Sequence, residues 1–170
     1  MNLGRHFLDD AIKSFKKGKA LADKAIAQIE EKDFHWQPDN ESNSIAIVMK
    51  HVSGNMISRW TDFLTTDGEK KDRNRDTEFV DDKSVEELMA FWDRGWQVLF
   101  NTLSSLNEDD LLKTVYIRAE PHTVVEAINR QMTHYGYHIG QIVYLAKHLR
   151  SENWKSLSIP RGKSADYLPK

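Results

Sequence analysis

Cysteine is missing from this chain of 170 residues. Its absence excludes disulfide bonds, thiolate zinc sites and a cysteine nucleophile. It also fits a reducing compartment, in which disulfides do not persist. Any thiol chemistry would therefore depend on a sulfur atom supplied by another molecule.

A dominant charge of one sign is missing too. The 24 lysines and arginines nearly balance the 26 aspartates and glutamates, which gives a net charge of −2. A protein that binds nucleic acid by neutralising phosphates needs a basic face. The composition therefore argues against nucleic-acid binding.

Long apolar runs are also missing, since none approaches the roughly 20 residues that span a membrane. The N-terminal residues contain no apolar leader segment before Asp9 and Asp10. A hydrophobic share of 39% and five tryptophans are typical of a folded core. We expect one globular domain over residues 1–170, located in the cytoplasm and without membrane association.

Apolar residues recur at helical spacing along four stretches of the chain. These stretches span about residues 3–31, 44–65, 84–106 and 123–150. The last two open with the capping boxes Ser84-Val85-Glu86-Glu87 and Thr123-Val124-Val125-Glu126. Between them we expect a short helical turn over 107–114 and an extended segment over 115–118.

Four long helices without a convincing strand pattern predict an all-α protein, a four-helix bundle over about residues 3–150. Two long connections allow a topology other than simple up-and-down. Residues 151–170 contain Pro160, Gly162 and Pro169, so we predict a non-helical tail. Its apolar residues predict that it packs on the bundle: Trp154, Leu157, Ile159, Tyr167 and Leu168.

His134 and His138 lie four residues apart in the last predicted helix, so they share one face about one turn apart. With His134 set at zero on a helical wheel, His138 falls near 40° and the apolar Ile142 near 80°. The pair therefore lies at the edge of the buried arc, together with Gln131 and Gln141. Two imidazoles placed in this way can hold one metal ion from one side.

His51 occupies the same kind of edge on the second predicted helix, which it shares with Asn55 and Asp62. If the two edges face each other, His51 converges with His134 and His138 on a divalent metal ion. Imidazole ligands suit zinc, nickel, copper or iron(II), and manganese less well. Three protein ligands leave a coordination position open, as in catalytic sites. The alternative is that these are hydrogen-bonded core or surface histidines.

His51, followed by His134-Tyr-Gly-Tyr-His138-Ile-Gly-Gln, resembles the DinB-like superfamily of four-helix bundles, with the resemblance covering about residues 3–150. The run from Asn55 to Gly68 and the sequence Ile159-Pro160-Arg161-Gly162 look like one uncharacterised bacterial branch. The resemblance implies a three-histidine metal site. It also implies one of several activities, among them transfer of low-molecular-weight thiols such as bacillithiol, and metal-dependent hydrolysis.

Tyr135 follows His134 where a zincin has its general-base glutamate. A hydrolase would need another base, and Asp62 is the only acid on the edge of the second helix. A metal ion deprotonates a bound thiol without such a base. We therefore favour thiol transfer with a thiol cosubstrate, with a hydrolase or a non-catalytic metal-binding stress protein as alternatives. The candidate catalytic residues are Asn55, Arg59 and Asp62.

Two further groups have both a structural and a functional interpretation. Arg59, Arg73 and Arg75 could bind a carboxylate on a cosubstrate, or form surface ion pairs. Trp60, Trp92 and Trp96 are predicted to belong to the core rather than to a substrate site.

Gly136 and Gly140 lie on one strip of the last predicted helix, away from the histidines. Each glycine inside a helix costs about 1 kcal/mol relative to alanine, so a close approach of another element is expected there. That element could be another helix, the tail or a partner subunit. Because twofold dimers are the commonest soluble assembly and DinB-like relatives often dimerise, we predict a homodimer.

Overall fold

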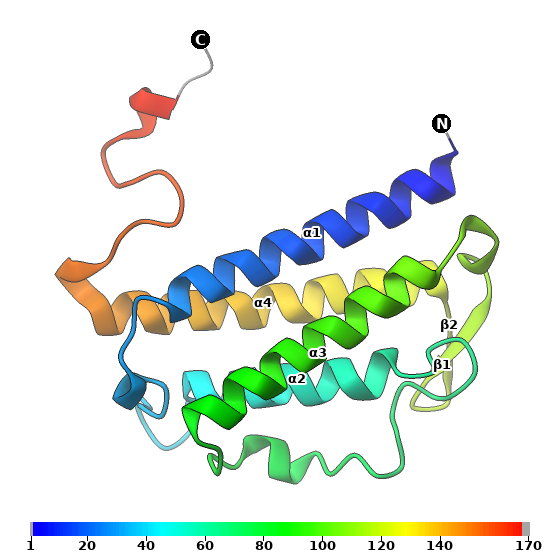
Figure 1. Cartoon of the computed structure of the whole chain (residues 1–170), viewed down its shortest axis with the longest axis horizontal. Helices are drawn as coiled ribbons and strands as arrows, with labels where there is room; N and C mark the ends of the chain where they lie inside the picture. The colour runs from blue at the N-terminus through cyan, green and yellow to red at the C-terminus, as the bar shows by residue number, and fades with distance from the viewer. Residues whose placement is uncertain (1, 168–170) are drawn as a thin grey trace.

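The computed structural model of the chain describes residues 2–167 and consists mainly of four long helices (Figure 1). The helices are α1 (Leu3–Ile26), α2 (Ile45–Trp60), α3 (Val85–Ser105) and α4 (Val124–Arg150). The strands are β1 (Thr114–Ile117) and β2 (Glu120–Thr123), and the 3₁₀ turns are η1 (Glu31–Asp33), η2 (Asp76–Phe79), η3 (Glu108–Asp110), η4 (Ser151–Asn153) and η5 (Ser164–Tyr167). The predicted helical bundle is confirmed. Within the described residues, no helix has the length and hydropathy needed to cross a bilayer.

The helices are arranged as two parallel pairs. α1 packs on α4 and runs in the same direction, whereas α2 packs on α3 and both run in the opposite direction (Figure 1). Parallel neighbours require a crossover, so the segment 61–84 returns along α2 before α3 begins (Figure 1). This crossover segment carries η2 into contact with α2.

The two predicted capping boxes are confirmed. Ser84 accepts a hydrogen bond from the Glu87 backbone N–H at 3.3 Å, and the Glu87 carboxylate accepts one from the Ser84 backbone N–H at 2.9 Å. Thr123 and Glu126 make the same exchange at the start of α4. These bonds satisfy N–H groups that have no partner inside the helix, and they fix where α3 and α4 begin.

α1 ends at Ile26, five residues before the predicted end. A capping interaction between Glu30 and Asp33 opens a separate 3₁₀ turn and prevents the helix from continuing. The Gln28 side chain is also engaged with the tail, donating to the Lys155 carbonyl at 3.1 Å and accepting from the Lys155 N–H at 2.8 Å. A local cap and a contact distant in sequence therefore both lie where this helix ends.

α2 ends at Trp60 rather than near residue 65, and Asp62 adopts a positive φ of 48°. The turn that follows is held by bonds to other parts of the chain. The Gly68 N–H donates to the Tyr116 carbonyl at 2.8 Å, and the Ser58 hydroxyl donates to the Gly68 carbonyl at 3.0 Å. These bonds direct the chain away from the helix axis and into the crossover.

β1 and β2 form an antiparallel hairpin, with Thr114 opposite Thr123. The sequence predicted the extended segment over 115–118 but not the hairpin. Arg118 and Ala119 both have positive φ, 56° and 61°, at a tight turn where glycine or asparagine is usual. The Asp67 carboxylate accepts from both of their N–H groups, at 2.9 and 2.7 Å, and so supports the turn from outside the hairpin.

The core lies between the helix pairs and is rich in aromatic side chains. Trp60, Trp92 and Trp96 are at most 1% exposed, so the prediction that they belong to the core is confirmed. Trp60 donates through its indole N–H to the Tyr135 hydroxyl at 3.1 Å. Tyr135 in turn donates to the Asn55 side-chain oxygen at 3.0 Å, which links α2 and α4 next to the predicted histidine site.

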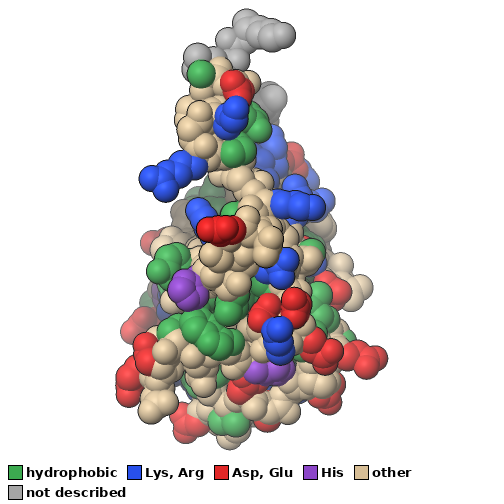
Figure 2. Space-filling view, turned by 90° about the vertical axis from the view of Figure 1, so that its left-hand side faces the viewer, with side chains coloured by type: hydrophobic (Ala, Val, Ile, Leu, Met, Phe, Trp, Pro, Cys, Tyr) green, Lys and Arg blue, Asp and Glu red, His purple; other side chains and the backbone are tan. Residues whose placement is uncertain are grey.

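The tail packs on the bundle only in its first part. Trp154 and Leu157 contact the core, whereas Ile159 and Tyr167 are 46% and 58% exposed, and Leu168 lies outside the described residues. Figure 2 shows this segment as a narrow projection above the helical body. The prediction that Ile159 and Tyr167 pack on the bundle is therefore wrong: each apolar side chain lies on a segment that leaves the helices.

Candidate metal centre

The structure brings the three predicted histidines together. His51 comes from α2, and His134 and His138 come from consecutive turns of α4. One ring nitrogen from each lies within 4.8 Å of the others, and the Nε2 atoms of His51 and His134 are 3.4 Å apart. Two nitrogens bound to one tetrahedral zinc ion at about 2.0–2.1 Å would stand about 3.4 Å apart. The spacing therefore fits a metal ion.

Two of the three histidines have a hydrogen-bond acceptor on the outer ring nitrogen, whereas the buried Nδ1 of His134 has no partner among the described residues. His51 Nδ1 lies 2.9 Å from the Glu78 carboxylate, and His138 Nδ1 lies 2.8 Å from the Gln141 amide oxygen. Both partners are acceptors, so each Nδ1 carries the proton and each Nε2 presents a lone pair. The buried Nε2 of His138 has no hydrogen-bond partner among the described residues. Metal-binding histidines are oriented in this way in proteins.

The surroundings keep the α4 histidines neutral. Burial lowers the pKa of His134 to about 3, and the neighbouring His138 and His51 add to the effect. Burial also lowers the pKa of His138 to about 4, against the opposing influence of Gln141. A neutral imidazole is the form that binds a metal ion.

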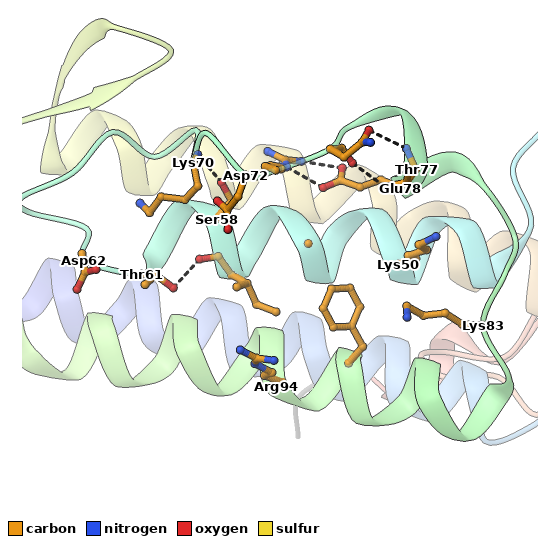
Figure 3. A pocket seen from close by; sticks show the side chains of 15 residues that line it. Lys50, Ser58, Thr61, Asp62, Lys70, Asp72, Thr77, Glu78, Lys83 and Arg94 are labelled. Carbon is orange, nitrogen blue, oxygen red and sulfur yellow. Dashed lines mark hydrogen bonds and ion pairs between the residues drawn. The ribbon is translucent and has the colours of Figure 1, made fainter.

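Glu78 is the carboxylate that positions His51. It belongs to η2, and Figure 3 shows it above α2. Two guanidinium nitrogens of Arg73 donate to the same carboxylate, at 2.7 and 2.8 Å. Burial would raise the pKa of Glu78, but the hydrogen bonds from His51 and Arg73 and the charge of Arg73 outweigh it and lower the pKa. Glu78 is thus an ionised, fixed partner for His51.

Gly54 makes room for that carboxylate on α2. A Cβ atom added at Gly54 would lie 2.7 Å from Glu78 Oε1, closer than such contacts occur. The glycine thus has a specific reason inside the helix, namely the approach of Glu78 one turn from His51.

A cavity of about 540 Å³ opens beside the histidines. Its lining includes His51 and His134, the side chain of Tyr137 and five arginines. Phe79 stacks on the His51 ring with centroids 4.9 Å apart, and Tyr137 lies 4.3 Å from the His138 ring. Aromatic rings therefore flank the histidines, and one face remains accessible to a small molecule.

The three candidate catalytic residues separate in the structure. Asn55 and Arg59 line the histidine cavity, but both are buried, and Asn55 is occupied by the Tyr135 hydroxyl. Asp62 follows the end of α2 and lines a second cavity, between α2, α3 and the crossover (Figure 3). Asp62 is therefore not among the residues that surround the histidines, because α2 ends before the turn on which the helical wheel placed it.

Sequence reasoning missed Glu78, Phe79 and Tyr137. Glu78 and Phe79 belong to the charged crossover, which has no helical periodicity that would link them to His51. Glu78 lies 27 residues after His51 in the chain. Gln141 was placed on the histidine edge by the helical wheel, and its contact with His138 follows from the i, i+3 spacing on α4. Spacing along α4 could therefore indicate Gln141 as a partner of His138, whereas no sequence pattern indicated Glu78 and Phe79 as partners of His51.

Comparison with known proteins gives a family match. A family model described as "Protein of unknown function (DUF1572)" matches residues 2–163. No curated protein matches the chain. Since the match includes all four helices, the hairpin and the three histidines, the chain belongs to the DUF1572 family of proteins of unknown function.

Proposed function

We propose that the protein is a divalent-metal-dependent enzyme of the DinB-like type that transfers a small thiol to an electrophile in the cytoplasm. The observation that carries the proposal is the set of three histidines whose free nitrogens meet beside a cavity of about 540 Å³. Three protein ligands with an adjoining cavity are the pattern of catalytic metal sites. Cytoplasmic thiols remain reduced and can serve as cosubstrates.

Zinc or nickel is the metal we expect, with iron or manganese as alternatives, because the ligands are all imidazoles. His51, His134 and His138 would hold the ion, and Glu78 and Gln141 would keep two of the rings in position. When bound, the ion supplies a positive charge that favours the thiolate form of a thiol cosubstrate.

The residues around the site bind and orient in this proposal and do not act as a general base. The sulfur forms a bond to the electrophilic carbon, the leaving group departs with the electron pair of the broken bond, and the thiol proton passes to solvent. Phe79 and Tyr137 offer aromatic surface beside the histidines against which a substrate could pack. Thiol transfer needs no further proton acceptor from the chain.

A hydrolase is the less favoured alternative because it needs a base to activate water. Glu78 is the nearest carboxylate, but its oxygens are engaged by His51 and Arg73, and its lowered pKa makes it a weak base. Asp62 lines the other cavity. A non-catalytic metal-binding protein is the remaining alternative, and only a turnover measurement separates it from an enzyme.

The test has two stages. Elemental analysis of tag-free protein should find one divalent ion per chain in the wild type and loss of that ion in His138→Ala. The metal-loaded protein is then incubated with bacillithiol and chlorodinitrobenzene, and thiol consumption is followed against a His51→Ala control. Metal without thiol consumption would refute the transferase and leave the metal site intact. Release of acid from ester substrates would favour the hydrolase.

A further inference from the structure

The cavity beside the histidines is lined by an unusual number of arginines. Two of them, Arg59 and Arg73, form its floor with side chains that are 1% and 6% exposed. The others, Arg75, Arg118 and Arg130, are exposed at its rim. We call these five residues the arginine cluster. No acidic residue lines the same cavity within the described part of the chain.

The charges of the arginine cluster are only partly compensated. Glu78 pairs closely with Arg73. Glu69 is shared by four members of the cluster, and its contacts are long: 3.3 Å to Arg73 and to Arg118, 3.8 Å to Arg59 and 4.0 Å to Arg75. Charge-assisted hydrogen bonds are normally 2.7–2.9 Å long. Because the contacts with Glu69 are longer, the guanidinium groups retain N–H donors that can bind another anion.

Two arginines lack a close anionic partner altogether. Arg130 makes no ion pair with any described acid. When the Gln131 side-chain amide is oriented to satisfy its neighbours, its oxygen accepts from Arg130 at 3.1 Å and from Arg59 at 3.2 Å. Arg59 Nη1 is buried and has no hydrogen-bond partner in the described structure. Burial lowers the pKa of Arg59 to about 10, yet the side chain stays charged at neutral pH. The nearby Asp67 is occupied by the backbone N–H groups of the hairpin turn.

We propose that the arginine cluster binds the anionic group, a carboxylate or a phosphate, of the small molecule that reacts at the histidines. Guanidinium groups present paired donors that match the oxygens of such anions. The cavity volume of about 540 Å³ lies within the range of small-molecule sites. The inference rests on the proposed function in one respect, that the bound anion belongs to the substrate of the metal centre.

Anion binding itself can be measured without turnover and without metal. Isothermal titration calorimetry at low ionic strength would use succinate and inorganic phosphate as probes, with metal-free and zinc-loaded protein. The rim variants Arg130→Gln and Arg118→Gln should each weaken binding about threefold to tenfold, since each removes one charged donor. Arg94→Gln is the matched control, because Arg94 is exposed and lines the second cavity. A preference for succinate or for phosphate distinguishes the two anions.

Three outcomes would overturn the inference: no binding of either probe in either metal state, equal binding by all variants, or equal weakening by Arg94→Gln. Binding that requires zinc and ignores the rim variants would place the anion on the ion rather than on the arginines, and would leave the metal site standing. Anion binding that weakens as expected in a protein unable to hold zinc would support the anion site and refute the proposed metal-dependent function.

Discussion

Replacing Glu78 with glutamine tests how the crossover controls the metal centre. The carboxylate accepts from His51 at 2.9 Å and from Arg73 at 2.7 and 2.8 Å, and the side chains of Glu78 and Arg73 are 8% and 6% exposed. Glu78→Gln keeps the shape but removes the charge. Breaking a fully buried pair costs about 3–5 kcal/mol. Because Arg73 retains Glu69 at 3.3 Å, we expect a loss of about 2–3 kcal/mol in the free energy of unfolding.

The larger consequence should be on metal affinity. A neutral amide no longer fixes the His51 tautomer, and the loss of such a partner typically weakens metal binding about 10- to 100-fold. Zinc affinity would be measured for both proteins by competition with a chromophoric chelator at pH 7.5, where Glu78 of the wild type is ionised. Urea denaturation of the metal-free protein gives the stability change separately. Asp82→Asn is the control. It removes the carboxylate partner of Lys50, which lies on α2 next to His51.

Gly54→Ala tests the same contact from the helix. Its Cβ would displace the Glu78 carboxylate, whereas alanine favours the helix by about 1 kcal/mol. We expect weaker zinc binding and a loss of stability about 1 kcal/mol smaller than in Glu78→Gln, because the helix preference of alanine offsets part of the disturbed ion pair with Arg73. Zinc affinities within twofold of wild type in both Glu78→Gln and Gly54→Ala would refute the reasoning.

Two further predictions concern pH and assembly. The folded protein holds His134 and His138 at pKa values of about 3 and 4, against about 6.5 in the unfolded chain, so the unfolded state takes up protons first on acidification. The metal-free protein should lose at most about 1.4 kcal/mol of stability per histidine for each pH unit below about 6.5, measured by urea denaturation from pH 7.5 to 5. The homodimer remains a proposal. A Cβ at Gly136 or Gly140 would meet nothing within 4 Å in the described chain, so neither another helix nor the tail up to Tyr167 explains these glycines. Gly136→Leu should therefore fold as a monomer at least as stable as wild type, by light scattering and thermal melting.

Each of these predictions has a clear contrary result. Equal stability at pH 7 and pH 5.5 would show that the two histidines titrate normally in the folded protein. A monomer mass for the wild type at micromolar concentration would refute the dimer. A dimer that persists in Gly136→Leu would place the interface on another surface.

Local signals in the sequence determined the helical framework. The two capping boxes fixed where α3 and α4 begin, because the bonds they make join residues only three apart. The i, i+4 spacing of His134 and His138 put both rings on one face, and the apolar arc of α4 directed that face toward the interior. Helix periodicity on α2 likewise placed His51 at a buried edge.

Only the tertiary structure decided what surrounds the histidines. α2 and α3 are parallel, so the crossover must return along α2, and this path brings Glu78 and Arg73 to His51. The hairpin turn at Arg118 and Ala119 depends on Asp67, about fifty residues earlier in the chain, because neither residue favours positive φ by itself.

The arginine cluster has the same origin, since its members come from α2, the crossover, the hairpin and α4 and share no sequence pattern. The sequence by itself thus determined the four helices and the shared face of His134 and His138, because these follow from spacing within each helix. That His51 joins the pair from 83 residues away depended on which edges of α2 and α4 face each other, which the packing decided. The charges and hydrogen bonds that would make the histidines a working site arise between segments far apart in the chain, and only their packing brings them together.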